Sequence, residues 1–259
     1  MGVCLGCRPI YSKLGFLAVG RGKGSVARML KIRAISLSVL ALVVVSAMTT
    51  STALAGPVFH VGGKRLGQET RQIKLQIKGV ATLSAKVAGT EIAISCRNSV
   101  SEGSTIEGPN QGKGRLTFTS CKVDKPIELC AVAEPITTVQ TKAHLAIDPN
   151  NKQQKFVEFF EPQQGTTFAI LMFKGTGCGV ILGNQAVKGS IAAEVVPIER
   201  EVQEGLLNFP LKPITEVELG LTQGQKTKAG LTFANEPAVF AAAFGSRLDN
   251  GEQGGVFGQ

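Results

Sequence analysis

The sequence predicts an all-β domain: an antiparallel β-sandwich or barrel-like fold, held by disulfides and preceded by an N-terminal signal helix. Three observations lead to this prediction. Short segments of alternating apolar and polar residues recur from residue 71 onward. The connectors between them are too short for crossover helices. Four cysteines follow a leader that is typical of exported chains.

The leader carries most of the net charge. The chain has a formal charge of +9, and residues 1–55 hold seven basic residues and no acidic one, which leaves +2 for the rest. A charge confined to the leader says little about the partners of the folded protein. We therefore expect no nucleic-acid partner.

Residues 29–55 have the organisation of a signal peptide. Lys31 and Arg33 precede an apolar stretch over residues 34–48, and small residues then lead to Ala55, where cleavage is expected. The apolar stretch is shorter than the roughly 20 residues that span a bilayer. Met29 is the predicted initiator, because a start there gives a signal of ordinary length, and residues 1–28 would then be an extension outside the true protein. A membrane contact is expected only if residues 29–55 are retained as an anchor.

The first strands are predicted over residues 71–78, 83–87 and 92–96. Ile73, Leu75 and Ile77 alternate with polar residues, which gives one buried and one wet face. A turn at Gly89 and Thr90 separates the second and third strands, and continuing the alternation places the side chain of Cys96 inward.

Further strands are predicted at intervals along the remaining chain, over residues 115–121, 136–147, 155–160, 167–173, 185–196, 215–221, 230–233 and 239–244. Turn-rich segments separate them, and Asn250-Gly251 is the strongest tight-hairpin signal among these. A charged stretch after Pro197 suggests a boundary. Residues 56–200 are therefore predicted as the main β domain, and residues 201–259 as a C-terminal strand group that either stands apart or belongs to the same domain.

The four cysteines after the leader are expected to form two disulfides. Cys96, Cys121, Cys130 and Cys178 are an even set in an exported chain, and they allow three pairings. The working expectation joins Cys121 to Cys130 across a hairpin and Cys96 to Cys178 between distant strands. The spacing fits neither a redox Cys-x-x-Cys motif nor a recognised zinc site.

Residues that usually carry chemistry are scarce. The only histidines are His60 and His144, both interpreted as surface residues, and no tyrosine or tryptophan follows the leader. No metal site, cofactor or catalytic residue is predicted. A hydrolase would need two carboxylates beside one bond, for which the pairs are Glu158 with Glu161 and Glu216 with Glu218; both pairs are interpreted as solvated strand positions.

The cysteine and strand order resembles that of a group of uncharacterised secreted β-rich proteins of soil actinobacteria. The segments that carry the resemblance are "IAISC", "LTFTSC", the loop to Cys130, "ITTVQTKAHL", "GTTFAI", Cys178 and "VKGSI", and the tail "FANEPAVFAAAFGSRLDNGEQGG" is similar as well. The resemblance covers roughly residues 72–255. It implies export and an all-β fold, and it brings no known activity, substrate or binding residue.

These observations favour a non-enzymatic β module that is secreted or associated with the cell envelope, with a binding or structural role and an unknown ligand. An extracellular or envelope protein or polymer is the expected kind of partner. Two alternatives stay open: an exported hydrolase that acts on a polysaccharide or cell-wall polymer, and a surface protein held by an uncleaved N-terminal anchor. The sequence alone does not choose a ligand.

Overall fold

The computed structural model describes residues 56–125, 129–151, 155–219 and 225–258. The predicted signal peptide (29–55) and the extension before it lie outside the described residues. Within those residues the regular structure is antiparallel β apart from one short 3-10 segment, η2 (Thr176–Ile181), so the all-β prediction is confirmed. None of the described helical structure is long and apolar enough to span a membrane.

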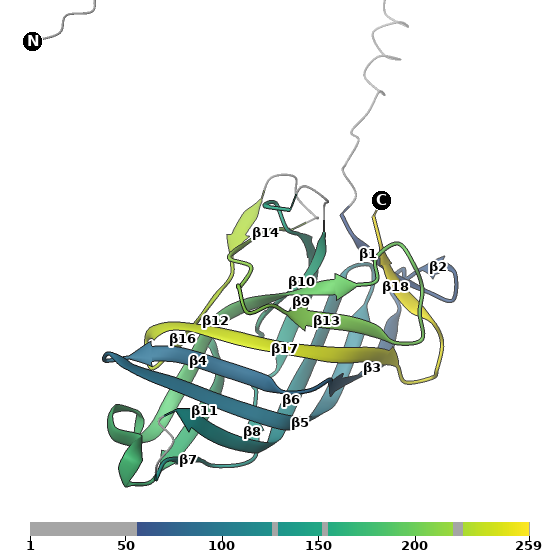
Figure 1. The fold of residues 1–259 in the computed structure, drawn as a ribbon. Helices are drawn as coiled ribbons and strands as arrows, with labels where there is room; N and C mark the ends of the chain where they lie inside the picture. The colour runs from purple at the N-terminus through teal and green to yellow at the C-terminus, as the bar shows by residue number, and fades with distance from the viewer. Residues whose placement is uncertain (1–55, 126–128, 152–154, 220–224, 259) are drawn as a thin grey trace, which may run out of the picture. The chain divides into compact units, whose positions relative to one another are not determined.

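Four long strands form the frame of the main sheet (Figure 1). They are β5 (Thr90–Glu107), β6 (Gln111–Lys125), β12 (Gly183–Val196) and β17 (Glu236–Leu248). β5 and β6 make one long hairpin around a turn at residues 108–110, where "GPN" supplies the glycine, proline and asparagine that tight turns favour.

Short strands laid end to end fill the spaces between the long ones. β3 and β4 both pair with β17 and β5, β13 and β16 pair with β12 and β17, β10 and β11 pair with β12, and β9 and β8 pair with β6. Their bounds are β3 (Thr70–Ile77), β4 (Ala81–Val87), β8 (Ile136–Thr137), β9 (Thr141–Ile147), β10 (Phe156–Pro162), β11 (Thr167–Lys174), β13 (Gly205–Phe209) and β16 (Gly230–Phe233).

The main sheet closes on itself. β9 pairs both with β10 and with β6, so the hydrogen bonding returns to the hairpin where it started. Among the described residues, four long and four composite strands give eight positions around this ring. A ring of eight strands is just wide enough for side chains to fill it or to hold one small ligand. The barrel-like alternative, rather than two stacked sheets, therefore describes the closure.

Smaller elements cover one end and one outer face of the closed sheet. β1 (Val58–Val61), β2 (Lys64–Arg65) and β18 (Gly254–Phe257) form a separate three-stranded sheet. Its Phe59 and Val256 pack with Ile106 and Leu145 of the closed sheet. β14 (Glu216–Leu219) and β15 (Lys226–Lys228) form a hairpin beside β9, and β7 (Ala131–Val132) pairs with β11.

The β14–β15 hairpin covers the outer face of β10, so β10 is buried on both faces. Val157 and Phe159 point outward and pack with Val217 of β14 and Ala229. The alternate residues of β10 point into the closed sheet.

Two turn predictions need adjustment. The tight turn between β4 and β5 is Ala88-Gly89, one residue earlier than expected, since Val87 pairs with Thr90. Asn250-Gly251 does form a turn, but it does not make a hairpin: β18, which follows it, pairs with β1 instead of β17.

The strands after residue 200, β13, β16 and β17, lie within the same closed sheet as the earlier ones.

The prediction of two disulfides is confirmed, but the working pairing is wrong. Cys96 is bonded to Cys121, with their Cα atoms 4.0 Å apart, and Cys130 is bonded to Cys178, with Cα atoms 4.7 Å apart. The reason is that β6 continues beyond Cys121 and stays paired with β5, which places Cys121 opposite Cys96 in the middle of a strand. Cys130 then lies on the following loop, beside η2.

The glycine-rich segment around Cys178 approaches the backbone before Cys130 closely. Gly175 has a φ of 116°, and a Cβ at this position would overlap the carbonyl oxygen of Leu129. The segment itself is the 3-10 helix η2 rather than a strand bulge.

Candidate functional site: a cavity inside the closed sheet

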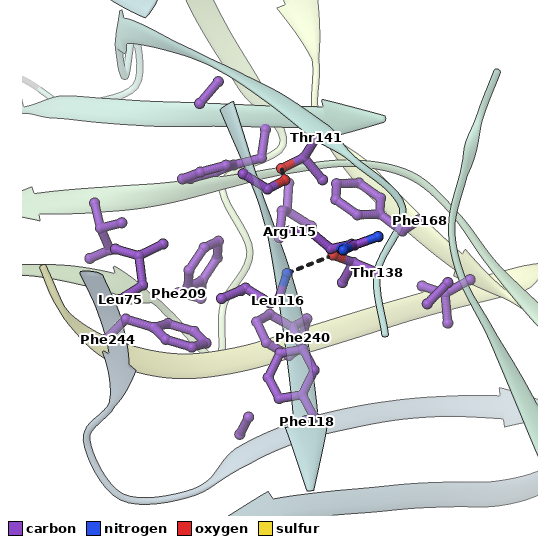
Figure 2. A pocket seen from close by; sticks show the side chains of 18 of the residues that line it. Leu75, Arg115, Leu116, Phe118, Thr138, Thr141, Phe168, Phe209, Phe240 and Phe244 are labelled. Carbon is purple, nitrogen blue, oxygen red and sulfur yellow. Dashed lines mark hydrogen bonds between the residues drawn. The ribbon is translucent and has the colours of Figure 1, made fainter. Parts of the chain in front are cut away.

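The interior of the closed sheet holds a cavity of about 140 Å³. All eight strand positions contribute to its wall, which is mostly apolar; one residue from each position is Leu75, Ile94, Leu116, Ala143, Phe160, Ile191, Leu207 and Phe240. Figure 2 shows phenylalanines 118, 209, 240 and 244 together around this space. Several phenylalanines of the main core therefore line the cavity.

One acidic residue, Glu158, lies in the cavity wall. It belongs to the inward row of β10, between Phe156 and Phe160, and it is only 6% exposed. Its carboxyl group makes no hydrogen bond or ion pair within the described residues. Burial raises the pKa of Glu158 from 4.5 to about 7, because a charged carboxylate loses its hydration inside an apolar space.

Two glycines of β6 make room for polar groups in this part of the wall. Gly112 and Gly114 are inward-facing and buried. Oε1 of Glu158 lies 3.4 Å from the position that a Cβ on residue 112 would occupy. A Cβ on residue 114 would overlap the hydroxyl oxygen of Ser104, which is itself 2% exposed and has no hydrogen-bond partner among the described residues.

A second cavity of about 80 Å³ adjoins the first. Ile73, Glu158 and Leu207 line both spaces, so the Glu158 side chain stands at their junction. The second cavity lies toward the end that the small β1–β2–β18 sheet covers, since Phe59 and Val256 are part of its wall.

Near Arg115, side-chain hydrogen bonds join the strands of the cavity wall where the regular backbone pairing is interrupted. β6 pairs with β9 up to Gly114 and with β8 from Thr117 onward. Between these pairings the hydroxyl of Thr141 donates to the carbonyl oxygen of Gly114 (2.8 Å), and the backbone N–H of residue 116 donates to the hydroxyl of Thr138 (2.9 Å). Figure 2 shows these bonds beside Arg115, a lining residue whose side chain is 46% exposed.

The structure separates the two carboxylates of the first predicted pair. Glu158 points into the cavity, whereas Glu161 lies on the other side of β10 and forms an ion pair with Lys142 of β9 (2.9 Å). They do not share a cleft. Of the second pair, Glu216 bonds Lys226 across the β14–β15 hairpin (2.9 Å), and this contact raises the pKa of Lys226.

The histidines lie away from the cavity wall. His144 is on the outward row of β9, as predicted, but it is half-buried rather than fully exposed. Burial lowers the pKa of His144, Lys142 lowers it further, and Glu161 opposes both. The ring of His60 stacks against Phe257 of β18, with centroids 4.3 Å apart.

Within the ranges that the structure describes, no three His, Cys, Asp or Glu side chains gather as a metal site would require. Comparison with known proteins adds no family: no protein-family model, curated protein or solved structure matches the chain.

Sequence reasoning missed the polar part of this site. The glycines of the segment "NQGKG" at residues 110–114 are typical of a turn, whereas Gly112 and Gly114 are strand residues that leave space inside the sheet. The available signal was the alternation itself: both glycines are in phase with Leu116 and Phe118, which face inward.

Proposed function

We propose that the chain is a non-enzymatic binding protein, secreted or associated with the cell envelope, that holds a small and largely apolar molecule inside its closed sheet. The observation that carries this proposal is the cavity of about 140 Å³, walled by apolar side chains from every strand position and containing one carboxyl group that has no partner among the described residues. Concave, mostly apolar sites with few polar groups are the usual form of small-molecule binding sites.

The size of the cavity limits the ligand. An apolar cavity of about 150 Å³ in another protein takes up benzene. A space of about 140 Å³ therefore suits a molecule of roughly six to ten non-hydrogen atoms, or the end of a longer chain. Left empty, such a cavity would lower the stability of the fold by roughly 3 kcal/mol, which a bound ligand would offset.

The cysteines and the leader support the proposed compartment. Two disulfides indicate an oxidising environment. Together with the signal-like residues 29–55, they support export. Retention by an uncleaved anchor is the alternative, and the mass of the exported product would distinguish cleavage after Ala55 from retention.

A hydrolase is less well supported by the geometry. Glycoside hydrolysis uses two carboxyl groups about 5–10 Å apart across one bond. Glu158 is the only acidic residue in the wall of either described cavity, and Glu161 points to the opposite face of β10. We therefore favour binding over polymer hydrolysis.

Toluene is a suitable first probe because it has an apolar body and no polar group. Calorimetric titration of the full-length protein should give saturable binding with a Kd of about 1 mM or tighter. Ala169→Leu, which adds volume to the cavity wall on β11, should weaken binding by about tenfold. The matched control Ile170→Leu changes a neighbouring, exposed residue and should leave the affinity unchanged.

Circular dichroism melting would check that Ala169→Leu still folds, and Leu116→Phe offers a second filling variant on a different strand. Absence of toluene binding to the folded wild-type protein, or equal affinity in wild type and both folded filling variants, would contradict the proposed function.

A further inference from the structure

We infer that the cavity selects amines: its ligand carries an ammonium group that pairs with the carboxylate of Glu158 and the hydroxyl of Ser104, while the rest of the molecule fills the apolar space. The inference rests on the proposed function and specifies its ligand class. It follows from the charges, the unpartnered polar atoms and the shape of the wall.

The uncompensated charge in the wall is negative. Three charged residues line the cavity, namely Lys113, Arg115 and Glu158. Nζ of Lys113 already contacts Glu107 at 2.6 Å, and Nη2 of Arg115 contacts Glu102 at 2.6 Å. Both cations are therefore neutralised at the rim. Glu158 has no such partner among the described residues, and it is the charged lining residue that is buried.

Unpartnered oxygen atoms gather on the same side of the wall. The Ser104 hydroxyl lies beside Gly114 and the Glu158 carboxyl beside Gly112, two positions about 7 Å apart along the inward row of β6. An ammonium group has three N–H donors and no acceptor, which matches a set of oxygen acceptors.

The fold has already desolvated the carboxyl group. An ion pair in an apolar interior gains little when both charges must first be dehydrated. Glu158 is buried before any ligand arrives, so only the ligand's ammonium has to lose its water on binding. The raised pKa of Glu158 is consistent with this state, and a bound cation would lower it again. Uncharged ligands of the same shape would gain no such interaction.

The test uses three probes with the same apolar body: toluene, benzyl alcohol and benzylamine, the last protonated at pH 8. In calorimetric titrations of the full-length protein at pH 8, benzylamine should bind at least about tenfold more tightly than toluene, and benzyl alcohol should lie between them. Glu158→Gln should remove the advantage of benzylamine and keep the affinity for toluene. Ser104→Ala should weaken benzylamine binding a few-fold and leave toluene binding unchanged.

Glu161→Gln is the matched control, since it removes a carboxylate from the outward row of the same strand. It should leave all three affinities unchanged. If toluene binds and benzylamine binds no more tightly, the amine inference fails while the proposed function stands. Retention of the benzylamine advantage in Glu158→Gln, or its loss in Glu161→Gln, would also overturn the inference. If toluene does not bind, the proposed function itself fails.

Discussion

The two halves of the β5–β6 hairpin share one pair of strands and differ in what they place inside the closed sheet. Far from the turn, Ile92, Ile94 and Val123 are buried in the main core, and Cys96 is bonded to Cys121. Near the turn, the buried inward positions of β6 are the glycines 112 and 114.

The backbone pairing continues through both halves, with two register shifts. The difference therefore lies in side-chain volume and polarity rather than in secondary structure. The half with large apolar side chains and a covalent bridge stabilises the fold. The half with glycines leaves space in which the side-chain oxygens of Ser104 and Glu158 have no partner among the described residues. One hairpin therefore supplies both part of the core and part of the wall of the proposed binding site.

Among the changes to the two halves of the hairpin, removing the Cys96–Cys121 disulfide should have the largest effect on stability. The double substitution Cys96→Ala with Cys121→Ala opens a loop with a sequence separation of 25 residues, so the free energy of unfolding should fall by roughly 3.5 kcal/mol. Urea denaturation of the oxidised proteins measures this. Cys130→Ala with Cys178→Ala is the matched comparison, with a separation of 48 residues and an expected loss of roughly 4 kcal/mol. A loss below about 1 kcal/mol in both would show that the bridges do not stabilise the fold as loop closure requires.

The next effect concerns the carboxyl group of Glu158 on β10, which lies beside Gly112 in the other half of the hairpin. Because the pKa of Glu158 is about 7 in the folded protein and 4.5 in its ordinary state, the folded state holds the proton more tightly. Below pH 4.5 both states are protonated. Between pH 4.5 and 7 only the unfolded state ionises, so the free energy of unfolding should fall as the pH rises, by roughly 3 kcal/mol in total.

Glu158→Gln should remove this fall and make the protein more stable than wild type at pH 8. Urea denaturation at several pH values between 4 and 8 measures it, with Glu161→Gln as the control that should keep the wild-type pH dependence. Parallel curves for wild type and Glu158→Gln would contradict a buried, unpaired Glu158.

The third and smallest effect tests the glycines. Gly114→Ala places a methyl group against the Ser104 hydroxyl, so the free energy of unfolding should fall by about 1–2 kcal/mol. Combining it with Ser104→Ala should recover part of the loss, because the obstructing oxygen is then absent. A double-mutant cycle by urea denaturation measures the coupling. Strictly additive losses would mean that the two side chains do not compete for the same space.

The strand content could be predicted from the sequence because alternation and turn residues are local signals. The disulfide pairing depended on register. Cys96 and Cys121 lie thirteen and twelve residues from Pro109, at the centre of the "GPN" turn, so a long hairpin about this turn places them opposite each other. The Cys96–Cys121 pair could therefore have been predicted from the sequence, but the short spacing between Cys121 and Cys130 favoured the wrong pair.

Other features depended on distant contacts. Asn250-Gly251 has a hairpin signal, yet the strand after it pairs with the first strand of the described chain, which no local pattern reveals. Glu158 was interpreted as solvated because acidic strand residues usually are. Its neighbours on both faces are apolar, from Phe156 to Phe160, and this pattern could have indicated a strand buried on both sides. Closure of the sheet, and therefore the cavity, required the pairing of β9 with β6.

The most direct test of the account is the titration of Glu158 itself. Carbon-13 NMR of the side-chain carboxyl, assigned by comparison with Glu158→Gln, gives its pKa in the free protein and in the presence of saturating benzylamine. We predict a pKa of about 7 in the free protein and a clear decrease when benzylamine is bound. A free pKa near 4.5 that benzylamine does not change would contradict a buried carboxylate that receives the ligand.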